Sequence, residues 1–127
     1  MKPWDMGDIM RPSGCLYSTV NDLMVFARAN LGGLGHPLEP TLASTQRIQL
    51  SRPEEDVALG WLINYLGEDR QQITYKHGMV AGYHAYLGMN VERRIVVVVL
   101  CNTFAWEDKI GHNLLLRLSG GLNAPTP

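Results

Sequence analysis

The sequence contains little cysteine, no long apolar run and no excess of charge of either sign. Its 127 residues include two cysteines, Cys15 and Cys101, which are too few for a disulfide scaffold and lack the CxxC spacing of zinc sites. The longest purely apolar run, Ile95–Cys101, is far shorter than the roughly 20 residues that a membrane helix needs. Eleven basic residues against twelve acidic ones leave no positive excess to attract nucleic acid or an anionic membrane.

A rich supply of apolar residues indicates one globular domain over residues 1–127. Hydrophobic residues make up 46% of the chain and charged residues 18%, so a buried core is expected and disorder is not. Residues 1–12 contain no apolar stretch typical of a secretory signal. We therefore expect a chain without signal peptide or transmembrane segment, cytoplasmic by default, that uses no cofactor.

Two helices are predicted in the first half of the chain. Residues 1–17 are predicted to be irregular, because glycine and proline interrupt every helical or strand period. Thr19 is then a suitable N-cap, with Asp22 three residues later in capping-box spacing. Apolar residues recur at helical intervals until two glycines at positions 32 and 33 end the helix. A second, weaker helix is predicted for residues 41–50.

Four consecutive strands and a final helix are predicted in the second half. The strand patterns, separated by turn-forming residues, cover residues 59–65, 72–76, 83–90 and 95–101. The last of these is typical of a strand buried on both faces. An amphipathic helix follows from Trp106 to Leu118, and residues 120–127 form a tail. The predicted fold class is α+β: an antiparallel sheet of about four consecutive strands, flanked by two N-terminal helices and one C-terminal helix.

One short motif, Lys76-His77-Gly78, could carry chemistry. It lies where a strand is predicted to end and a bend bracketed by Gly78 and Gly82 begins. A lysine there is useful if it faces an anionic substrate, and a glycine beside it allows a ligand to approach the backbone closely. The structural alternative is a solvated lysine on an edge strand, followed by a turn.

Motifs for metal binding and nucleophilic catalysis do not occur in these residues. The four histidines show no HxH or HExxH spacing, and His84 is interpreted as a packed or hydrogen-bonded side chain. No serine is followed three residues later by lysine, and no GxSxG sequence is present. Cys101, inside an apolar strand, is expected to be an unreactive thiol. Trp61 and Trp106 are expected to anchor the core.

Three stretches, in this order, carry a resemblance to a known family. They are RPSGCLYSTVNDLMVF at residues 11–26, LGW at residues 59–61, and KHGMVAGY at residues 76–83 with IVVVVLCN at residues 95–102. The first stretch is similar to the start of a helix in that family, and the second to its GLGW strand. The third is similar to its Lys-Thr-Gly or His-Thr-Gly strand and the apolar strand that follows it. The chain thus resembles the C-terminal part of the serine β-lactamase-related family, which includes class C β-lactamases, penicillin-binding-protein-like carboxypeptidases and esterases of that fold.

The resemblance implies roles for four consecutive residues. Lys76 matches the basic residue of the Lys-Thr-Gly motif, which holds the protons of the catalytic cluster in place and attracts the substrate carboxylate. His77 stands where the family has Thr or Ser, and a shifted register with His77 as the basic residue remains an alternative. Gly78 would keep the strand flat against the substrate, and the backbone N–H of Met79 would be one of two oxyanion-hole donors.

The resemblance does not extend to the nucleophile. In the family a Ser-x-x-Lys motif supplies the nucleophilic serine and a Tyr-x-Asn-like motif its proton-transfer partner, and neither occurs in these residues. Without the serine no acyl-enzyme can form. We therefore expect no complete set of catalytic residues here and no hydrolysis by this chain alone.

Two hypotheses from different functional classes follow. In the first, the chain is a C-terminal fragment of a serine hydrolase that carries the substrate-side Lys-x-Gly strand. In the second, it is a stand-alone, non-catalytic binding or oligomer-assembly module that kept the fold. An esterase whose triad assembles in space is a third alternative. Apolar surface left uncovered would favour a homo-oligomer or a complementing chain, and the expected small-molecule ligand is an acyl or β-lactam-like compound.

Overall fold

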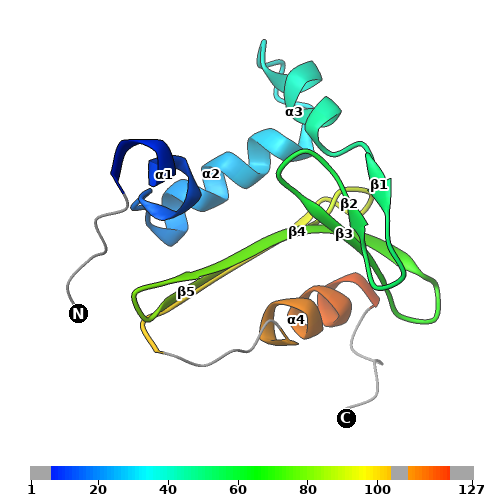
Figure 1. The fold of residues 1–127 in the computed structure, drawn as a ribbon. Coiled ribbons are helices and arrows are strands. Elements are labelled where there is room, and N and C mark those ends of the chain that lie inside the picture. The colour runs from blue at the N-terminus through cyan, green and yellow to red at the C-terminus, as the bar shows by residue number, and fades with distance from the viewer. Residues whose placement is uncertain (1–6, 104–108, 121–127) are drawn as a thin grey trace.

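Antiparallel strands form one sheet in chain order, with helices both before and after it in the chain (Figure 1). The computed structural model describes residues 7–103 and 109–120. The helices are α1 (Gly7–Gly14), α2 (Val20–Leu31), α3 (Glu39–Thr45) and α4 (Lys109–Gly120). The strands are β1 (Leu50–Ser51), β2 (Asp56–Val57), β3 (Leu62–Leu66), β4 (Gln71–Val80), β5 (Tyr83–Asn90) and β6 (Ile95–Cys101). The predicted α+β class with an antiparallel meander is confirmed, and the short β1 and β2 extend the predicted sheet to six strands.

The sheet separates two helical layers. In Figure 1, α1 and α2 lie on one face of the sheet and α4 lies on the other. Both α2 and α4 pack on β5 and β6, so these two strands are covered from both sides. None of the described helices is long and apolar enough to cross a membrane.

Helix α2 begins and ends as the sequence predicts. The Thr19 hydroxyl oxygen accepts a hydrogen bond from the backbone N–H of Asp22 at 3.2 Å, and the Asp22 carboxylate accepts one from the Thr19 hydroxyl at 2.9 Å. This pair satisfies donors that a helix N-terminus leaves open. At the other end the chain turns through Gly32 and Gly33, whose φ angles of 69° and 82° lie in the region that favours glycine.

The prediction that residues 1–17 are irregular is wrong for α1, which is helical from Gly7 to Gly14. A proline inside a helix removes its own N–H bond and crowds the carbonyl four residues earlier, but Pro12 lies in the last turn, so only the end of this short helix is affected. The helical bond beyond it still forms, from the Cys15 N–H to the Arg11 carbonyl at 3.0 Å. A single proline near its end therefore does not prevent α1 from forming.

The second helix is displaced from its predicted position. It is α3, Glu39–Thr45, instead of residues 41–50, because Pro40 is accepted in the first turn of a helix. It ends where the hydroxyl groups of Ser44 and Thr45 donate to backbone carbonyls three residues back. The chain then enters β1 instead of continuing as a helix.

Strand β4 is longer than predicted. The sequence placed its end before a bend bracketed by Gly78 and Gly82, but the strand runs from Gln71 to Val80 and includes Gly78. The bend is a two-residue turn of Ala81 and Gly82, with φ angles of 51° and 82°. Two positive φ angles are typical of a type I′ hairpin turn, which keeps both strands paired up to the turn.

The other boundaries differ less. Strand β3 begins at Leu62, because Gly60, with a φ of 82°, interrupts the extended backbone before it. Helix α4 includes Gly120, which was assigned to the tail. Residues 121–127 and Trp106 lie outside the described residues.

Strand β6 is less buried than predicted. Val97 is its buried residue, Leu100 is exposed, and the other side chains of the strand are half-buried. The reason is its place in the sheet: β6 is the last strand in the order, so only one of its long edges is paired within the described residues. A strand needs neighbours on both sides to be buried as a continuous apolar run.

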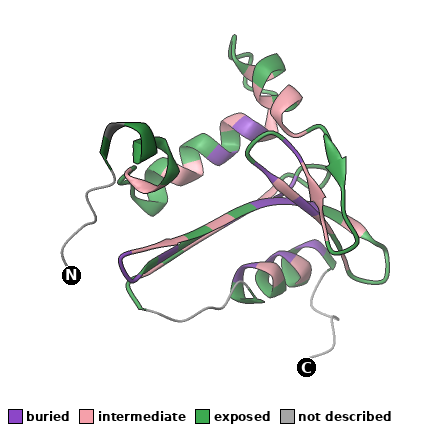
Figure 2. Cartoon of the chain, viewed as in Figure 1, coloured by how far each residue is buried: buried purple, intermediate pink, exposed green. Residues whose placement is uncertain are grey.

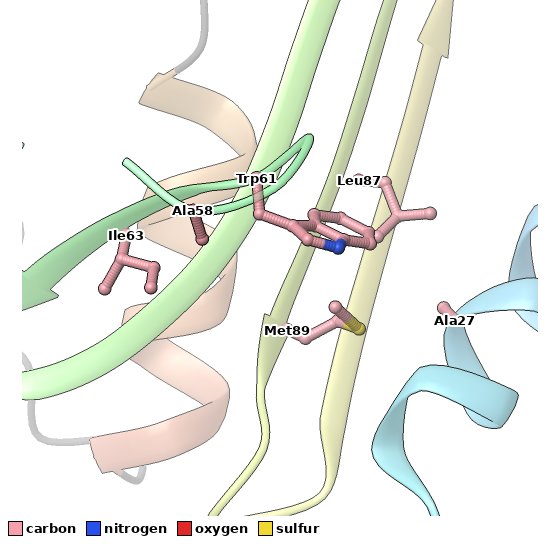
Figure 3. Close-up of a cluster of buried hydrophobic side chains, with 6 residues drawn as sticks. All are labelled: Ala27, Ala58, Trp61, Ile63, Leu87 and Met89. Atoms are coloured by element: carbon pink, nitrogen blue, oxygen red, sulfur yellow. The ribbon is translucent and has the colours of Figure 1, made fainter. Parts of the chain in front are cut away.

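The core has two parts, one on each face of the sheet. On the α2 face the buried cluster includes Trp61, Leu87 and Met89, and Figure 3 shows Ala27 facing them from α2. On the α4 face it includes Tyr86 and Leu115 together with Ile73, Tyr75 and Val97. Figure 2 shows the buried segments on the strands and on parts of α2 and α4, whereas α1 is largely exposed. The prediction that Trp61 anchors the core is confirmed.

Candidate functional site

The four residues singled out from the sequence lie next to one another on β4 but point to opposite faces of the sheet. Side chains alternate along a strand. Lys76 is opposite Leu87, which belongs to the α2-side cluster, and His77 is opposite Tyr86, which belongs to the α4-side cluster. Lys76 and Gly78 therefore face α2, whereas the side chains of His77 and Met79 face α4.

A groove lies on the α2 face of β4, between the sheet and helices α1 and α2. Its volume is about 630 Å³, within the range of small-molecule sites, and Lys76 and Gly78 line it together with Phe26, Trp61 and Tyr83. A smaller cavity of about 430 Å³ adjoins it near the β4–β5 turn and shares several wall residues with it, among them Tyr83. The groove brings together segments that are far apart in the sequence.

One wall of the groove is aromatic. The rings of Phe26 and Trp61 stack with centroids 6.2 Å apart and planes 15° from parallel. The Trp61 indole N–H donates to the Thr45 hydroxyl at 3.2 Å, so α3 fixes the orientation of the ring. Such a pair presents a rigid apolar surface to a ligand.

The loop that carries α3 is itself held by charge-assisted hydrogen bonds. The Glu39 carboxylate accepts backbone N–H bonds from Leu34 at 2.6 Å, from Gly33 at 3.1 Å and from His36 at 3.2 Å. These donors, with His36 contributing most and Leu34 next, lower the pKa of Glu39 below its ordinary value of 4.5. The anchored loop keeps Thr45 of α3 beside Trp61.

Lys76 and Gly78 also line the groove and leave space for a ligand there. The Lys76 side chain is exposed, and within the described part of the chain no ion pair neutralises it. A β-carbon added at Gly78 would meet no atom within 4 Å, so there is space above the backbone at this point of the strand. The buried Asn30 side chain also lines the groove and donates to the Phe26 carbonyl at 2.9 Å. Its side-chain oxygen, Oδ1, has no hydrogen-bond partner among the described residues.

On the other face of the sheet, His77 belongs to a cluster of aromatic and histidine rings. Its ring stacks on Tyr75 with centroids 6.0 Å apart and meets the ring of His84 edge-on at 6.5 Å. The Tyr86 hydroxyl is 2.8 Å from Nδ1 of His112 on α4. His84 is buried, in agreement with its interpretation as a packed side chain.

Sequence reasoning missed most of this neighbourhood. Alternation along β4 and β5 could have grouped Tyr75, His77, His84 and Tyr86 on one face, but nothing in the sequence reveals that His112 of α4 packs against them. Phe26 and Trp61 were likewise visible only as apolar residues of separate elements. In residues 7–103 and 109–120, no three His, Cys, Asp or Glu side chains are grouped so that they could hold a metal ion.

Comparison with known proteins identifies the family. No curated protein matches the chain. The family model described as Beta-lactamase, however, matches residues 1–120, which is nearly the whole chain. Together with the antiparallel sheet and its flanking helices, this match shows that the chain belongs to the Beta-lactamase family.

Proposed function

We propose that these 127 residues form the substrate-binding side of a serine-hydrolase site and do not supply its nucleophile. The observation that carries the proposal is the groove itself: an exposed cation, Lys76, and an aromatic wall, Phe26 and Trp61, line the same space. Family membership supports a hydrolase origin. The sequence contains neither a Ser-x-x-Lys nor a Tyr-x-Asn motif.

The ligand that best fits this groove is an acyl compound with a carboxylate. Lys76 would attract the carboxylate, and the Phe26–Trp61 wall would take an apolar or aromatic acyl group. Gly78 leaves the space for such a ligand to lie along the strand. A β-lactam-like compound has the same combination of a carboxylate and an acyl side chain.

The alternation along β4 supports Lys76, and not His77, as the basic residue. A residue that recognises the ligand must point into the groove, and the His77 ring packs instead against Tyr75 and His84. If the motif is matched one residue later, so that His77 is its basic residue, that side chain lies on the α4 face of the sheet and not on the groove face.

Met79 would contribute through its backbone alone. Its side chain faces α4, and its N–H is proposed as one of two oxyanion-hole donors, a role worth about 3 kcal/mol in acyl transfer. That stabilisation acts on a tetrahedral intermediate, which forms only if a nucleophile from outside these residues attacks. No cofactor is needed in this scheme.

A stand-alone, non-catalytic binding or assembly module is the second candidate function. The observation in its favour is the number of large apolar side chains that stay exposed, among them Leu16, Tyr17 and Val25. Surfaces of this kind mark sites of association between proteins. A module of this type would have no reason to bind a ligand carboxylate more tightly than the corresponding neutral amide. A comparison of these two ligands therefore distinguishes the two candidate functions experimentally.

The test is a fluorescence titration with Trp61 as the single reporter, after Trp4→Phe and Trp106→Phe. The probes are N-benzoyl-alanine and its uncharged amide. The proposal predicts that the carboxylate binds roughly tenfold more tightly than the amide, because only the carboxylate pairs with Lys76. Lys76→Gln should remove this preference.

The matched control is Lys109→Gln, which removes a lysine from α4 on the other face of the sheet. It should leave the preference for the carboxylate unchanged. Equal binding of the two probes, or a preference that survives Lys76→Gln, would contradict the proposed function.

A further inference from the structure

Asn30 carries a buried polar atom that has no partner within the described part of the chain. The residue lies near the end of α2, is 5% exposed and lines the groove. Its Oδ1 accepts no hydrogen bond from any of the described residues. An unpaired acceptor in a protein interior is destabilising, and such an atom is usually met by an ordered water molecule or by a ligand.

The orientation of the Asn30 amide is fixed by its nitrogen. Nδ2 donates to the Phe26 carbonyl at 2.9 Å, and a carbonyl oxygen can only accept. Exchanging the two amide atoms would place Oδ1 against that carbonyl, so the unpaired atom is the oxygen. The backbone carbonyl of Asn30 already accepts a hydrogen bond from Gln46 Nε2 at 2.9 Å, which ties the residue to the end of α3.

The side-chain donors beside the aromatic wall are used elsewhere. Thr45 and Trp61 line the groove together with Asn30. The Trp61 indole N–H donates to the Thr45 hydroxyl at 3.2 Å, and the Thr45 hydroxyl donates to the Leu42 carbonyl at 2.7 Å. A ligand group that pairs with Oδ1 therefore has to supply an N–H or O–H of its own.

Asn30 lies towards the end of the groove that is away from Gly78. Helix α2 begins near the β4–β5 turn, where Leu23 lines the smaller cavity beside that turn. It ends near the β5–β6 turn, from which Arg94 donates to the Leu31 carbonyl at 3.3 Å. Gly78 is close to the first of these turns, and Asn30 is close to the second.

Phe26 lies between these two ends of the groove. It precedes Asn30 by four residues, so the two share one face of α2 and are about 6 Å apart along the helix axis. Phe26 stacks on Trp61 to form the aromatic wall. A ligand ring on this wall would therefore reach Asn30 with a substituent on the side of the ring that points away from Gly78.

We propose that Asn30 determines the specificity of the groove and selects an aryl acyl group with a hydroxyl or amino substituent on its ring. The ring packs on the Phe26–Trp61 wall, and the substituent donates a hydrogen bond to Asn30 Oδ1. This inference rests on the proposed function, because it specifies the acyl group that the groove would take.

Access to Oδ1 requires a small movement of the groove lining, because this atom is enclosed in the structure. Phe26 is 47% exposed and Leu42 is half-buried, and both line the groove. Changes of side-chain rotamer at such positions are common when a partner binds. The ligand ring would displace one of these side chains as it enters.

Isothermal titration calorimetry with two probes of similar size tests the proposal. N-(4-hydroxybenzoyl)-alanine and N-(4-methylbenzoyl)-alanine share the carboxylate and the ring and differ only in the hydroxyl or methyl substituent. The hydroxyl probe should bind roughly tenfold more tightly, because only its substituent supplies a donor to Asn30. Asn30→Leu has a similar volume without a polar atom and should remove or reverse this preference, and circular dichroism should show that the variant is folded.

Two further variants serve as controls. Asn21→Leu makes the same substitution at an exposed position of α2 outside the groove, and it should keep the preference for the hydroxyl probe. Lys76→Gln distinguishes this inference from the proposed function. It should weaken the binding of both probes alike and leave their ratio unchanged, since both carry the carboxylate that pairs with Lys76.

Equal binding of the two probes by the unaltered protein would overturn the inference, even where Lys76→Gln weakens both and the proposed function stands. It would mean that a water molecule, or no group at all, meets Oδ1. A preference that survives Asn30→Leu would overturn the inference as well. Failure of both probes to bind would contradict the proposed function, and the inference with it.

Discussion

The aromatic ring of Tyr86 fills the space that a β-carbon on Gly111 would occupy. Gly111 is therefore the point at which helix α4 comes closest to strand β5, and the hydrogen bond between Tyr86 and His112 lies one residue further along the helix. On the same strand, Gly88 leaves room for the Tyr86 ring in the same way. Two glycines and one tyrosine thus set the distance between the sheet and its C-terminal helix.

Replacing Gly111 by alanine should destabilise the protein. The added methyl group meets the Tyr86 ring, so helix or ring must move, and overpacking of this kind costs about 1–3 kcal/mol. Urea denaturation followed by circular dichroism measures the change. Gly120→Ala in the same helix is the matched control, since a β-carbon there meets no atom within 4 Å. An equal effect of the two substitutions would show that helix propensity, and not the Tyr86 contact, matters at position 111.

Gly78→Ala should separate folding from ligand binding. The added β-carbon has no neighbour within 4 Å, so stability should change by less than about 0.5 kcal/mol. The same methyl group projects into the groove, and binding of N-benzoyl-alanine should weaken several-fold. Unchanged affinity in a correctly folded variant would place the ligand away from Gly78.

The strands and the first long helix could be predicted from the sequence because local rules decide them. The alternating residues of β5 and the apolar run of β6 define strands without knowledge of their partners, and Thr19 with Asp22 marks the start of α2. The site could be predicted only in part. The motif identified Lys76 and Gly78. That both lie on the same face of the sheet became clear only from the structure, in which β4 continues through Gly78 to Val80.

The remaining features depend on tertiary contacts that a local pattern does not contain. The groove needs Phe26 of α2 to meet Trp61 before β3, across more than thirty residues of chain. The ring cluster needs His112 of α4 to reach Tyr86 of β5. In α1, the glycines and prolines of residues 1–17 suggested an irregular segment, although Pro12 lies in the last turn, too late in the helix to prevent it from forming.

Glu39 should make stability depend on pH. Its pKa is lowered in the folded state, so the unfolded state binds a proton more readily. The stabilisation is therefore present above the ordinary pKa of 4.5 and is lost as the pH falls through the lower pKa of the folded state. Glu39→Gln should lower the melting temperature at pH 7, and the difference from the wild type should shrink as the pH is lowered below 4.5.

Thermal unfolding at a series of pH values measures this difference. Glu68→Gln is the matched control, since it removes an exposed carboxylate in the β3–β4 turn that does not hold the loop before α3. A Glu39→Gln effect of constant size across the whole series would mean that the carboxylate charge does not hold the loop.

The measurement that tests the account most directly is turnover by these 127 residues of a chromogenic ester and a chromogenic cephalosporin, made on a sample that binds N-benzoyl-alanine. We predict binding that depends on Lys76, with no burst and no hydrolysis above the rate in buffer, because under the proposed function the nucleophile comes from outside these residues. Turnover that Ser13→Ala abolishes would contradict the account, since Ser13 also lines the groove and would then be the missing nucleophile.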